Sequence, residues 1–189
     1  LVDRVPSAQL LSTSEYQDDF AALLAGPGGE LWAAWVAYRR QANSVIVRRF
    51  DGNTWQTAQT VSEKPGDHFL VKLGRDRQGR VWAVWSAQVS GNWDLYGRSF
   101  DGRSWSATTR LTEDPQPDIY HNLASDSGGN LWLVWQGFRK GRSDIFARRY
   151  DGAAWSAAER VSTSAANDWD PAIAADASGR VYVAWDSYD

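Results

Sequence analysis

The sequence predicts an all-β protein with the architecture of a β-propeller, built from repeats of about 50 residues. Three observations support this prediction. One pattern returns with a fixed period, and the second tryptophan of its apolar core falls at Trp35, Trp85, Trp135 and Trp185. Each repeat contains four short segments with the patterns of strands, and no window shows the sustained period of a helix. The second segment is apolar on both faces, which indicates sheets stacked between other sheets.

The first two strands of a predicted blade, A and B, are joined by a D-x-x-G turn. Strand A is a short apolar run such as AIAA at 172–175, and it ends in a turn such as 176–179. Aspartate stabilises such a turn through its own backbone, and glycine accepts a positive φ. Strand B is LWLVW at 131–135, so Trp132 and Trp135 point to opposite faces of the sheet.

Strands C and D form the second half of each repeat. Residues 144–150 alternate between two faces, as in a strand with unlike surroundings on its two sides. The segment ends in Asp-Gly at 151–152, which is a signal for a two-residue hairpin loop. Trp155 then opens strand D. Four short antiparallel strands in each repeat are the plan of a propeller blade.

The repeat boundaries predict a single propeller domain over residues 1–189. Its parts are strand D of the closing blade (1–12), three full blades (13–62, 63–112 and 113–162), and strands A and B of the closing blade (163–189). The chain begins with Leu1 and not with Met, which suggests a processed or excised piece. Three assemblies fit these boundaries: a closed ring of roughly four blades, a homodimer that completes a ring of about eight, or an arc of a longer propeller.

Composition excludes several classes of function. A net charge of −3 argues against nucleic acid or an anionic membrane as a partner, because both need a basic face. No apolar run approaches the roughly 20 residues of a membrane span. The absence of cysteine excludes disulfides, thiol catalysis and cysteine-ligated metals. The 12 tryptophans make the chain Trp-rich, and they can supply much of the core.

A family resemblance is carried by the hairpins at 50–55, 100–105 and 150–155, which share the pattern [FY]-D-G-x-x-W. This pattern resembles a shortened Asp-box, the S-x-D-x-G-x-x-W turn of sialidase-type and other bacterial-neuraminidase-repeat propellers. The spacing from Gly to Trp agrees, but one residue is missing between Asp and Gly. In that superfamily the Asp-box is an element of the fold, so the resemblance implies the architecture and transfers no catalytic residue.

Residues that recur in every blade are interpreted as structural. Arg48, Arg98 and Arg148 stand at one strand position in successive repeats, whereas the arginine triad of a sialidase comes from different blades of an asymmetric site. We expect them to stack on tryptophan or to pair with the turn aspartates. The two histidines, His68 and His121, do not lie in a nucleophile elbow, which argues against a Ser-His-Asp triad.

The candidate ligand site is a polar column at the predicted channel mouth. In a propeller the D–A and B–C loops gather on one face, where the central channel opens. The column consists of Asp18, His68, Asp118 and Asp168, and the B–C loops add Tyr38 and Phe138. Such a set suits a sugar, an ammonium group or a hard cation such as Ca²⁺. Alternatively, the aspartates cap their own loops and bind no ligand.

The leading hypothesis is a non-catalytic binding or interaction module, glycan-directed and extracytoplasmic, with a carbohydrate or protein ligand at the channel mouth. No cofactor is expected apart from the Ca²⁺ version of the site. One alternative is a piece of a larger sialidase-like or lyase-like enzyme whose catalytic residues lie on other blades. Another is a repeat that only spaces neighbouring domains. The B–C segments 88–93 and 138–143 differ from each other, which favours a functional face over a spacer.

Overall fold

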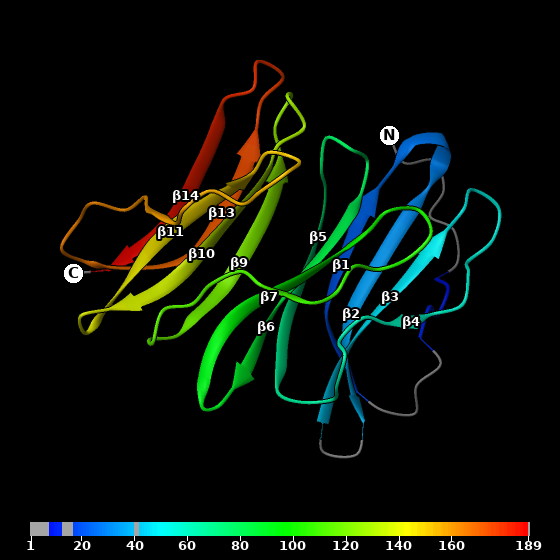
Figure 1. The fold of residues 1–189 in the computed structure, drawn as a ribbon, viewed down its shortest axis with the longest axis horizontal. Helices are drawn as coiled ribbons and strands as arrows, with labels where there is room; N and C mark the ends of the chain where they lie inside the picture. Colours follow the sequence, from blue (N-terminus) through cyan, green and yellow to red (C-terminus); the bar gives the residue numbers. More distant parts are fainter. Residues whose placement is uncertain (1–7, 13–16, 40–41, 189) are drawn as a thin grey trace.

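The protein folds into four antiparallel β-sheets that follow one another along the chain (Figure 1). The computed structural model describes residues 8–12, 17–39 and 42–188. Within these residues, three sheets have four strands each and the last sheet has two. In every sheet the strands are hydrogen-bonded in chain order. This is the predicted propeller architecture, with one sheet, or blade, for each repeat.

The long strands of each blade are eight or nine residues long, and the outer strand of the first three blades is a pair of residues. Blade 1 contains β1 (Asp18–Ala25), β2 (Leu31–Arg39), β3 (Ala42–Phe50) and β4 (Gln59–Thr60). Blade 2 contains β5 (His68–Arg75), β6 (Val81–Val89), β7 (Asn92–Phe100) and β8 (Thr109–Arg110). Blade 3 contains β9 (Asp118–Ser125), β10 (Leu131–Arg139), β11 (Arg142–Tyr150) and β12 (Glu159–Arg160). Blade 4 contains β13 (Asn167–Ala175) and β14 (Val181–Tyr188).

Helical structure in the described residues is limited to a short 3-10 turn, η1 (Pro27–Gly29), which replaces the D-x-x-G turn of the other blades. The expectation of almost no helix is therefore confirmed for this part of the chain. No helix among the same residues has the length and apolar character needed to cross a membrane.

The strands β1, β5, β9 and β13 form the inner layer of the molecule. Each one packs against the next in chain order, and blade 4 packs against blade 3 at the opposite end of the row from blade 1 (Figure 1). The described residues thus form an arc of adjacent blades. Closure of this arc into a ring stays a prediction. Of the proposed closing strand, 1–12, residues 8–12 are described, and they have no strand conformation.

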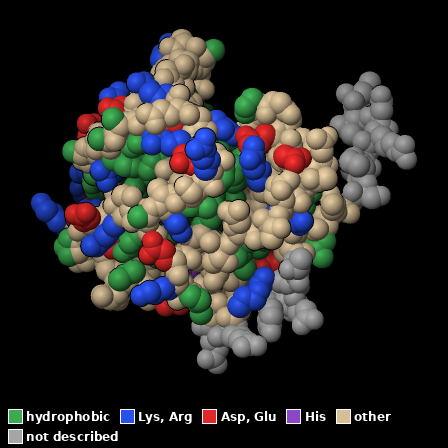
Figure 2. All heavy atoms as spheres, turned by 45° about the vertical axis from the view of Figure 1, so that its right-hand side comes forward, with side chains coloured by type: hydrophobic (Ala, Val, Ile, Leu, Met, Phe, Trp, Pro, Cys, Tyr) green, Lys and Arg blue, Asp and Glu red, His purple; other side chains and the backbone are tan. Residues whose placement is uncertain are grey.

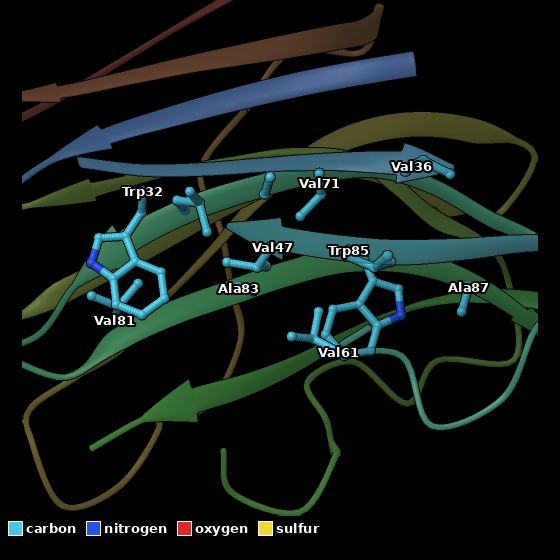
Figure 3. Packing of buried hydrophobic residues seen from close by; sticks show 12 residues of the cluster. Trp32, Val36, Val47, Val61, Val71, Val81, Ala83, Trp85 and Ala87 are labelled. Carbon is cyan, nitrogen blue, oxygen red and sulfur yellow. The ribbon is translucent and has the colours of Figure 1, made fainter. Parts of the chain in front are cut away.

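The core consists of apolar layers between adjacent blades. Between blades 1 and 2, Trp32 and Trp85 belong to one such layer, with valine and alanine side chains between and beyond them, and are 4% and 2% exposed (Figure 3). Trp35, three residues further along β2, faces the other way and packs with Leu11 and Trp55. The second strand is therefore buried on both faces, as its continuous apolar sequence predicts.

The recurrent arginines of the third strands tie each blade to the segment that precedes it. Each donates to one carbonyl after its own C–D loop and to one in the preceding segment: Arg48 to Gln56 and Leu11, Arg98 to Ser106 and Val61, and Arg148 to Ser156 and Leu111. The guanidinium groups of Arg48 and Arg148 also lie over Trp55 and Trp155, at 6.0 and 5.8 Å. The expected stacking on tryptophan is confirmed for these two arginines. Leu11 occupies, for blade 1, the place that Val61 has for blade 2.

The prediction of a two-residue hairpin after strand C is wrong. The loop has four residues, 151–154, because the bridge that closes it joins Tyr150 to Trp155. Asp151 Oδ1 accepts hydrogen bonds from the backbone N–H groups two and three residues further on, at 2.8 and 2.9 Å. The aspartate therefore stabilises the loop through its side chain, and strand D begins later than Trp155.

Gly102→Ala is expected to lower the free energy of unfolding by about 1 kcal/mol. Gly102 has a φ of 100° in the C–D loop of blade 2, and a Cβ there meets no atom within 4 Å, so backbone strain alone sets the cost. Gly152 has the equivalent position and a φ of 101°, but its Cβ would lie 2.8 Å from Arg77 Cδ. Gly152→Ala should therefore cost more. Urea unfolding of both variants checks this, and two unchanged midpoints would contradict the loop geometry.

Candidate functional site

The polar column lies at one end of the blades, where the first strands begin and the second strands end. Asp18, His68 and Asp118 are the first residues of β1, β5 and β9, and Asp168 is the second residue of β13. The sequence prediction placed these residues in loops and limited strand A to runs such as 172–175. That limit is wrong, because a β-bulge lets the strand continue through the polar segment. We call this end of the blades the rim, formed by 17–20, 67–70, 117–120 and 167–170 with the strand ends 37–39, 87–89, 137–139 and 187–188.

Asp118 points into its own blade. Its side chain is fully buried, and Oδ1 accepts hydrogen bonds from Trp135 Nε1 (2.9 Å) and from Arg139 (2.8 Å). Oδ2 has no well-formed hydrogen bond among the described residues, although the Thr112 side chain lies close to it. Burial raises the pKa of Asp118, and Arg139, Trp135 and Thr112 oppose this shift. Asp118 therefore holds Trp135 and Arg139 in fixed positions.

Asp168 and Asp18 also bind groups close to their own strands. Asp168 accepts hydrogen bonds from the hydroxyls of Ser187 (2.6 Å) and Ser164 (3.1 Å). Asp18 Oδ1 lies 3.2 Å from the Arg39 guanidinium. Both aspartates bind groups close to their own strand, as the loop-cap alternative expects. Their partners lie on strands as well as in loops.

The fourth member of the column, His68, is half-buried. Its Nε2 lies 2.9 Å from the Lys64 carbonyl oxygen, and burial lowers the pKa of His68. Among the residues that the structure describes, no group of three or more His, Asp or Glu side chains is placed to hold a metal ion.

The inner strands share a strained bulge at the rim. Phe20, Leu70, Tyr120 and Asp170 have positive φ angles between 46° and 55°, and the pairing register shifts at each of them. Side chains other than glycine rarely adopt this conformation. It costs on the order of 1 kcal/mol or more at each residue, and such strain is concentrated at functional sites. Since the four residues differ in type, the repeated feature is the backbone conformation.

The bulges present aromatic rings on the rim. Phe20 and Tyr120 are 41% and 39% exposed. The ring of Phe69 lies between them, with its centroid 4.5 Å from that of Phe20 and 5.4 Å from that of Tyr120. Trp93 contacts Phe69 at 6.4 Å. We call Phe20, Phe69, Trp93 and Tyr120 the aromatic row. Trp169, which has the repeat position of Phe69 in blade 4, is 44% exposed.

The two aromatic residues predicted for the B–C loops flank the column. They belong to the ends of β2 and β10, where the Tyr38 N–H donates to the Gln17 carbonyl and the Phe138 N–H to the Pro117 carbonyl, both at 2.9 Å. Tyr38 is 44% exposed, and Phe138 is half-buried. Both residues therefore lie on the rim, although on strands and not in loops.

Two pockets open beside the rim on blade 3. The first has a volume of about 520 Å³ and includes Asp114, Asp118 and Arg148, and the second has about 480 Å³ and includes Lys140, Arg142 and Arg160. Arg139 and Phe146 line both pockets. The Arg139 guanidinium lies 4.7 Å from the centre of the Phe146 ring and forms ion pairs with Asp114 and Asp118, both at 2.8 Å. Each pocket is therefore lined by an aromatic ring and by a cation that two carboxylates hold in place.

One cation of these pockets departs from the repeat. Blade 3 has Arg139, Lys140 and Arg142, where blade 2 has Val89, Ser90 and Asn92 and blade 1 has Arg39, Arg40 and Ala42. By contrast, the ion pair of Arg160 with Asp144 (2.6 Å) repeats that of Arg110 with Asp94 (2.7 Å). Charges elsewhere are mixed, and the described part of the face in Figure 2 shows basic and acidic side chains interspersed. Arg142, whose repeat position holds no cation in blade 1 or blade 2, is therefore a better candidate for a ligand contact than the recurrent pairs of the fold.

One buried Ser-His pair lies outside the candidate site. His121 Nδ1 is 3.4 Å from Ser86 Oγ, and Nε2 is 3.0 Å from the Val84 carbonyl oxygen. Ser86 and His121 are 0% and 2% exposed, so no substrate reaches them. Burial lowers the pKa of His121 to about 4. The pair is a packing contact between blades 2 and 3, in agreement with the absence of a nucleophile elbow in the sequence.

Sequence reasoning missed the aromatic row and the pockets of blade 3. A usable signal for the row was present: Phe20, Phe69 and Tyr120 follow the column positions by one or two residues. For the pockets, the signal was Arg142, which adds a third cation to a basic pair that blade 1 also has at 39–40. Neither signal has the period of the repeat, so an analysis based on recurring residues does not detect it.

Comparison with known proteins supports the fold. No family model and no curated protein sequence matches the chain. A protein of unknown function from Dyadobacter fermentans superposes with a TM-score of 0.71 at 11% identity, covering 92% of this chain and 63% of its own. An α-L-arabinofuranosidase of Fusarium graminearum superposes with a TM-score of 0.58 at 16% identity, covering 85% of this chain and 54% of its own. A subtype N10 neuraminidase-like protein of the isolate A/little yellow-shouldered bat/Guatemala has a TM-score of 0.56 at 11% identity, covering 84% of this chain and 48% of its own.

These similarities confirm the predicted β-propeller architecture. At identities of 11–16% they show the fold alone. The chain spans between about half and two thirds of the length of these three structures. The described blades therefore correspond to a part of each larger propeller.

Proposed function

We propose that the protein is a binding module without catalytic activity of its own, which takes carbohydrate at the rim in an extracytoplasmic setting. The observation that carries this proposal is the aromatic row. Phe20 and Tyr120 expose about two fifths of their surface on strained backbone, at the end of the blades where the inner strands begin. Exposed rings bind the apolar faces of sugar rings without a large loss of side-chain entropy, because their positions are already fixed.

The pockets of blade 3 supply the polar contacts that such a site needs. Asp118 and Tyr120 are two residues apart in β9, so the aromatic row and the Asp118–Arg139 pair lie at the same end of one strand. Arg139 is held by two carboxylates and lies over Phe146, which leaves a cation and a ring facing the same pocket. The added positive charge of Lys140 and Arg142 favours sugars with a carboxylate over neutral ones.

An enzymatic alternative is supported by one observation. The chain spans 54% of the arabinofuranosidase it resembles, so residues that act on a substrate can lie on blades beyond this chain. Incubation of a longer protein that contains this chain with arabinan and with uronate-containing polysaccharides, followed by an assay for new reducing ends, separates the two functions, because this chain alone gives no product under either. The binding-module proposal expects no product.

Tyr120→Ala is expected to weaken sugar binding roughly two- to tenfold, because it removes a stacking surface worth roughly 0.5–1.5 kcal/mol from an exposed ring. Isothermal titration with arabino-oligosaccharides and with oligogalacturonate measures the effect for a neutral and an acidic probe. Tyr120→Phe keeps the ring and should bind like the parent. Leu23→Ala is a matched control, since Leu23 is 73% exposed in the inner strand β1 and lies outside the rim.

Two results would contradict the proposal. If the parent binds neither probe, or if Tyr120→Ala and Leu23→Ala bind with the same affinity, the aromatic row is not the site. Loss of the acidic probe alone in Arg139→Ala would place its carboxylate in the blade 3 pockets.

A further inference from the structure

The junction between blades 2 and 3 is filled by side chains from the A–B turn of blade 2. The Arg80 guanidinium donates to the Tyr150 hydroxyl (2.7 Å) and to the Gly152 carbonyl (2.9 Å), and it lies 5.3 Å from the centre of the Tyr150 ring. Gln78 Nε2 donates to the same carbonyl at 3.0 Å. Arg77 covers the loop, since a Cβ on Gly152 would lie 2.8 Å from Arg77 Cδ. This junction therefore holds a cation against an aromatic ring and a backbone acceptor.

The equivalent place between blades 1 and 2 is open. Three residues of blade 1 have the repeat positions of the filling side chains: Pro27 for Arg77, Gly28 for Gln78, and Glu30 for Arg80. None of the three carries a side-chain donor. A Cβ on Gly102, the counterpart of Gly152, meets no atom within 4 Å. A pocket of about 340 Å³ lies here, between two blades of four strands each, and we call it the junction pocket.

Acidic side chains outnumber basic ones in the lining of the junction pocket. The lining includes Glu30, Asp51 and Asp101 on one side of the balance, and Arg49 and Arg75 on the other. Glu30 forms ion pairs with both arginines, at 2.8 and 2.5 Å. Asp101 uses Oδ1 to accept hydrogen bonds from two backbone N–H groups of its own loop, both at 2.8 Å, so Oδ2 is the atom that a ligand can reach. One bound cation balances the charge of these five side chains.

A buried indole donor lines the same pocket. Trp32 is 4% exposed, and its Nε1 has no hydrogen-bond partner among the residues that the structure describes. Figure 3 shows this nitrogen on the side of the ring that points away from Trp85. In blade 2 the corresponding Trp82 Nε1 donates to Asp76 at 3.0 Å, but Gly26 stands at the position of Asp76 in blade 1. A ligand that completes this junction therefore offers an acceptor as well as a cation.

We propose that the junction pocket binds an arginine residue of a partner polypeptide, with the guanidinium group in the place that Arg80 has in the next junction. The guanidinium then lies over Phe100, the counterpart of Tyr150, and donates to the Gly102 carbonyl and to Asp101. Its planar set of donors reaches both acceptors at once, which a lysine ammonium group does less well. A main-chain carbonyl of the same arginine residue accepts from Trp32. The pocket lies at the A–B turns and C–D loops, opposite to the rim, so the proposal is independent of sugar binding there.

Titration of the chain with N-acetyl-L-arginine N-methylamide, followed by nuclear magnetic resonance, tests the proposal. The indole N–H signal of Trp32, identified by its loss in Trp32→Phe, should shift and reach saturation. The corresponding citrulline compound has nearly the same shape without the charge, and it should bind at least about fivefold more weakly because its hydrogen bonds are not charge-assisted. Agmatine, which keeps the guanidinium but has no carbonyl, should also bind more weakly. A Trp32 signal that does not move, or equal affinities for the arginine and citrulline compounds, overturns the proposal.

The repeat supplies the variants that locate the site. Gly26→Asp combined with Glu30→Arg gives blade 1 the turn residues of blade 2, so the chain's own arginine fills the pocket and saturable binding of the arginine compound should be lost. Asp101→Asn keeps the Oδ1 acceptor of its loop but removes the charge, and it should weaken binding about fivefold. Asp151→Asn is the matched control, because Arg80 already fills the junction beside it.

Both aspartates are exposed and the asparagines keep the loop contacts, so the two single variants should melt like the parent. Binding that is unchanged in Asp101→Asn, or weakened equally in Asp151→Asn, overturns the assignment of the pocket. Binding that survives in the double variant overturns it as well.

Discussion

Trp135→Ala is expected to lower the free energy of unfolding by about 3–5 kcal/mol, the range for a large aromatic side chain removed from a core. Trp135 is 1% exposed and stacks on Phe146 at 5.8 Å with an interplanar angle of 23°. Its indole N–H donates to Asp118 Oδ1 at 2.9 Å. The variant therefore leaves a cavity between blades 2 and 3 and also removes a donor from a buried carboxylate, which adds to the cost.

The repeat supplies a matched comparison for this prediction. Trp85 has the same position in blade 2 and is 2% exposed, but its neighbour at the column is His68, which meets the indole edge-on at 6.4 Å. Trp85→Ala should therefore fall in the same range, without the additional loss at a buried carboxylate. Trp169→Ala, at 44% exposure, should change stability by less than about 1 kcal/mol. Urea denaturation gives all three values, and a near-neutral Trp135→Ala would show that strand B is not buried on both faces.

The strand pattern and the stacking of blades could be predicted because burial on both faces leaves a strong mark in the sequence. Trp32 and Trp35 are three residues apart in one strand, so they must face opposite sides, and both are buried in the structure. A strand with water on one face would have shown polar residues at alternate positions. The periodic tryptophans therefore made it possible to predict the position of the second strand and its burial between adjacent blades.

The rim could not be predicted in the same way, because its geometry depends on a backbone feature without a residue signature. Positive φ is usually marked by glycine or asparagine, yet the bulge positions hold Phe20, Leu70, Tyr120 and Asp170. The bulge is imposed by pairing with the second strand and by packing around the inner layer, which are tertiary effects. In a regular strand without the bulge, residues 118 and 120 would lie on the same face. The sequence alone gave no sign of the bulge, and the column was therefore predicted to lie in loops.

A pH-dependent loss of stability is expected from His121. Burial lowers the pKa of His121 to about 4 in the folded protein, from an ordinary value of 6.5, and the charge of Lys72 acts in the same direction. Between these two values the unfolded chain binds a proton that the folded chain does not bind. Stability therefore falls as the pH is lowered through 6.5, and the loss is complete below about 4. The difference of about 2.5 pKa units corresponds to roughly 3 kcal/mol in total.

The window between pH 7 and pH 5 isolates this effect, because most carboxylates of the fold remain ionised there. Over that range the contribution of His121 amounts to about 2 kcal/mol. His121→Gln removes the titrating group, so the difference in unfolding free energy between parent and variant should shrink by this amount from pH 7 to pH 5. His68, whose pKa burial also lowers, is present in both proteins and cancels in the comparison. Urea unfolding at half-unit pH steps gives the two curves, and parallel curves would mean that His121 reaches water and takes up its proton in the folded state.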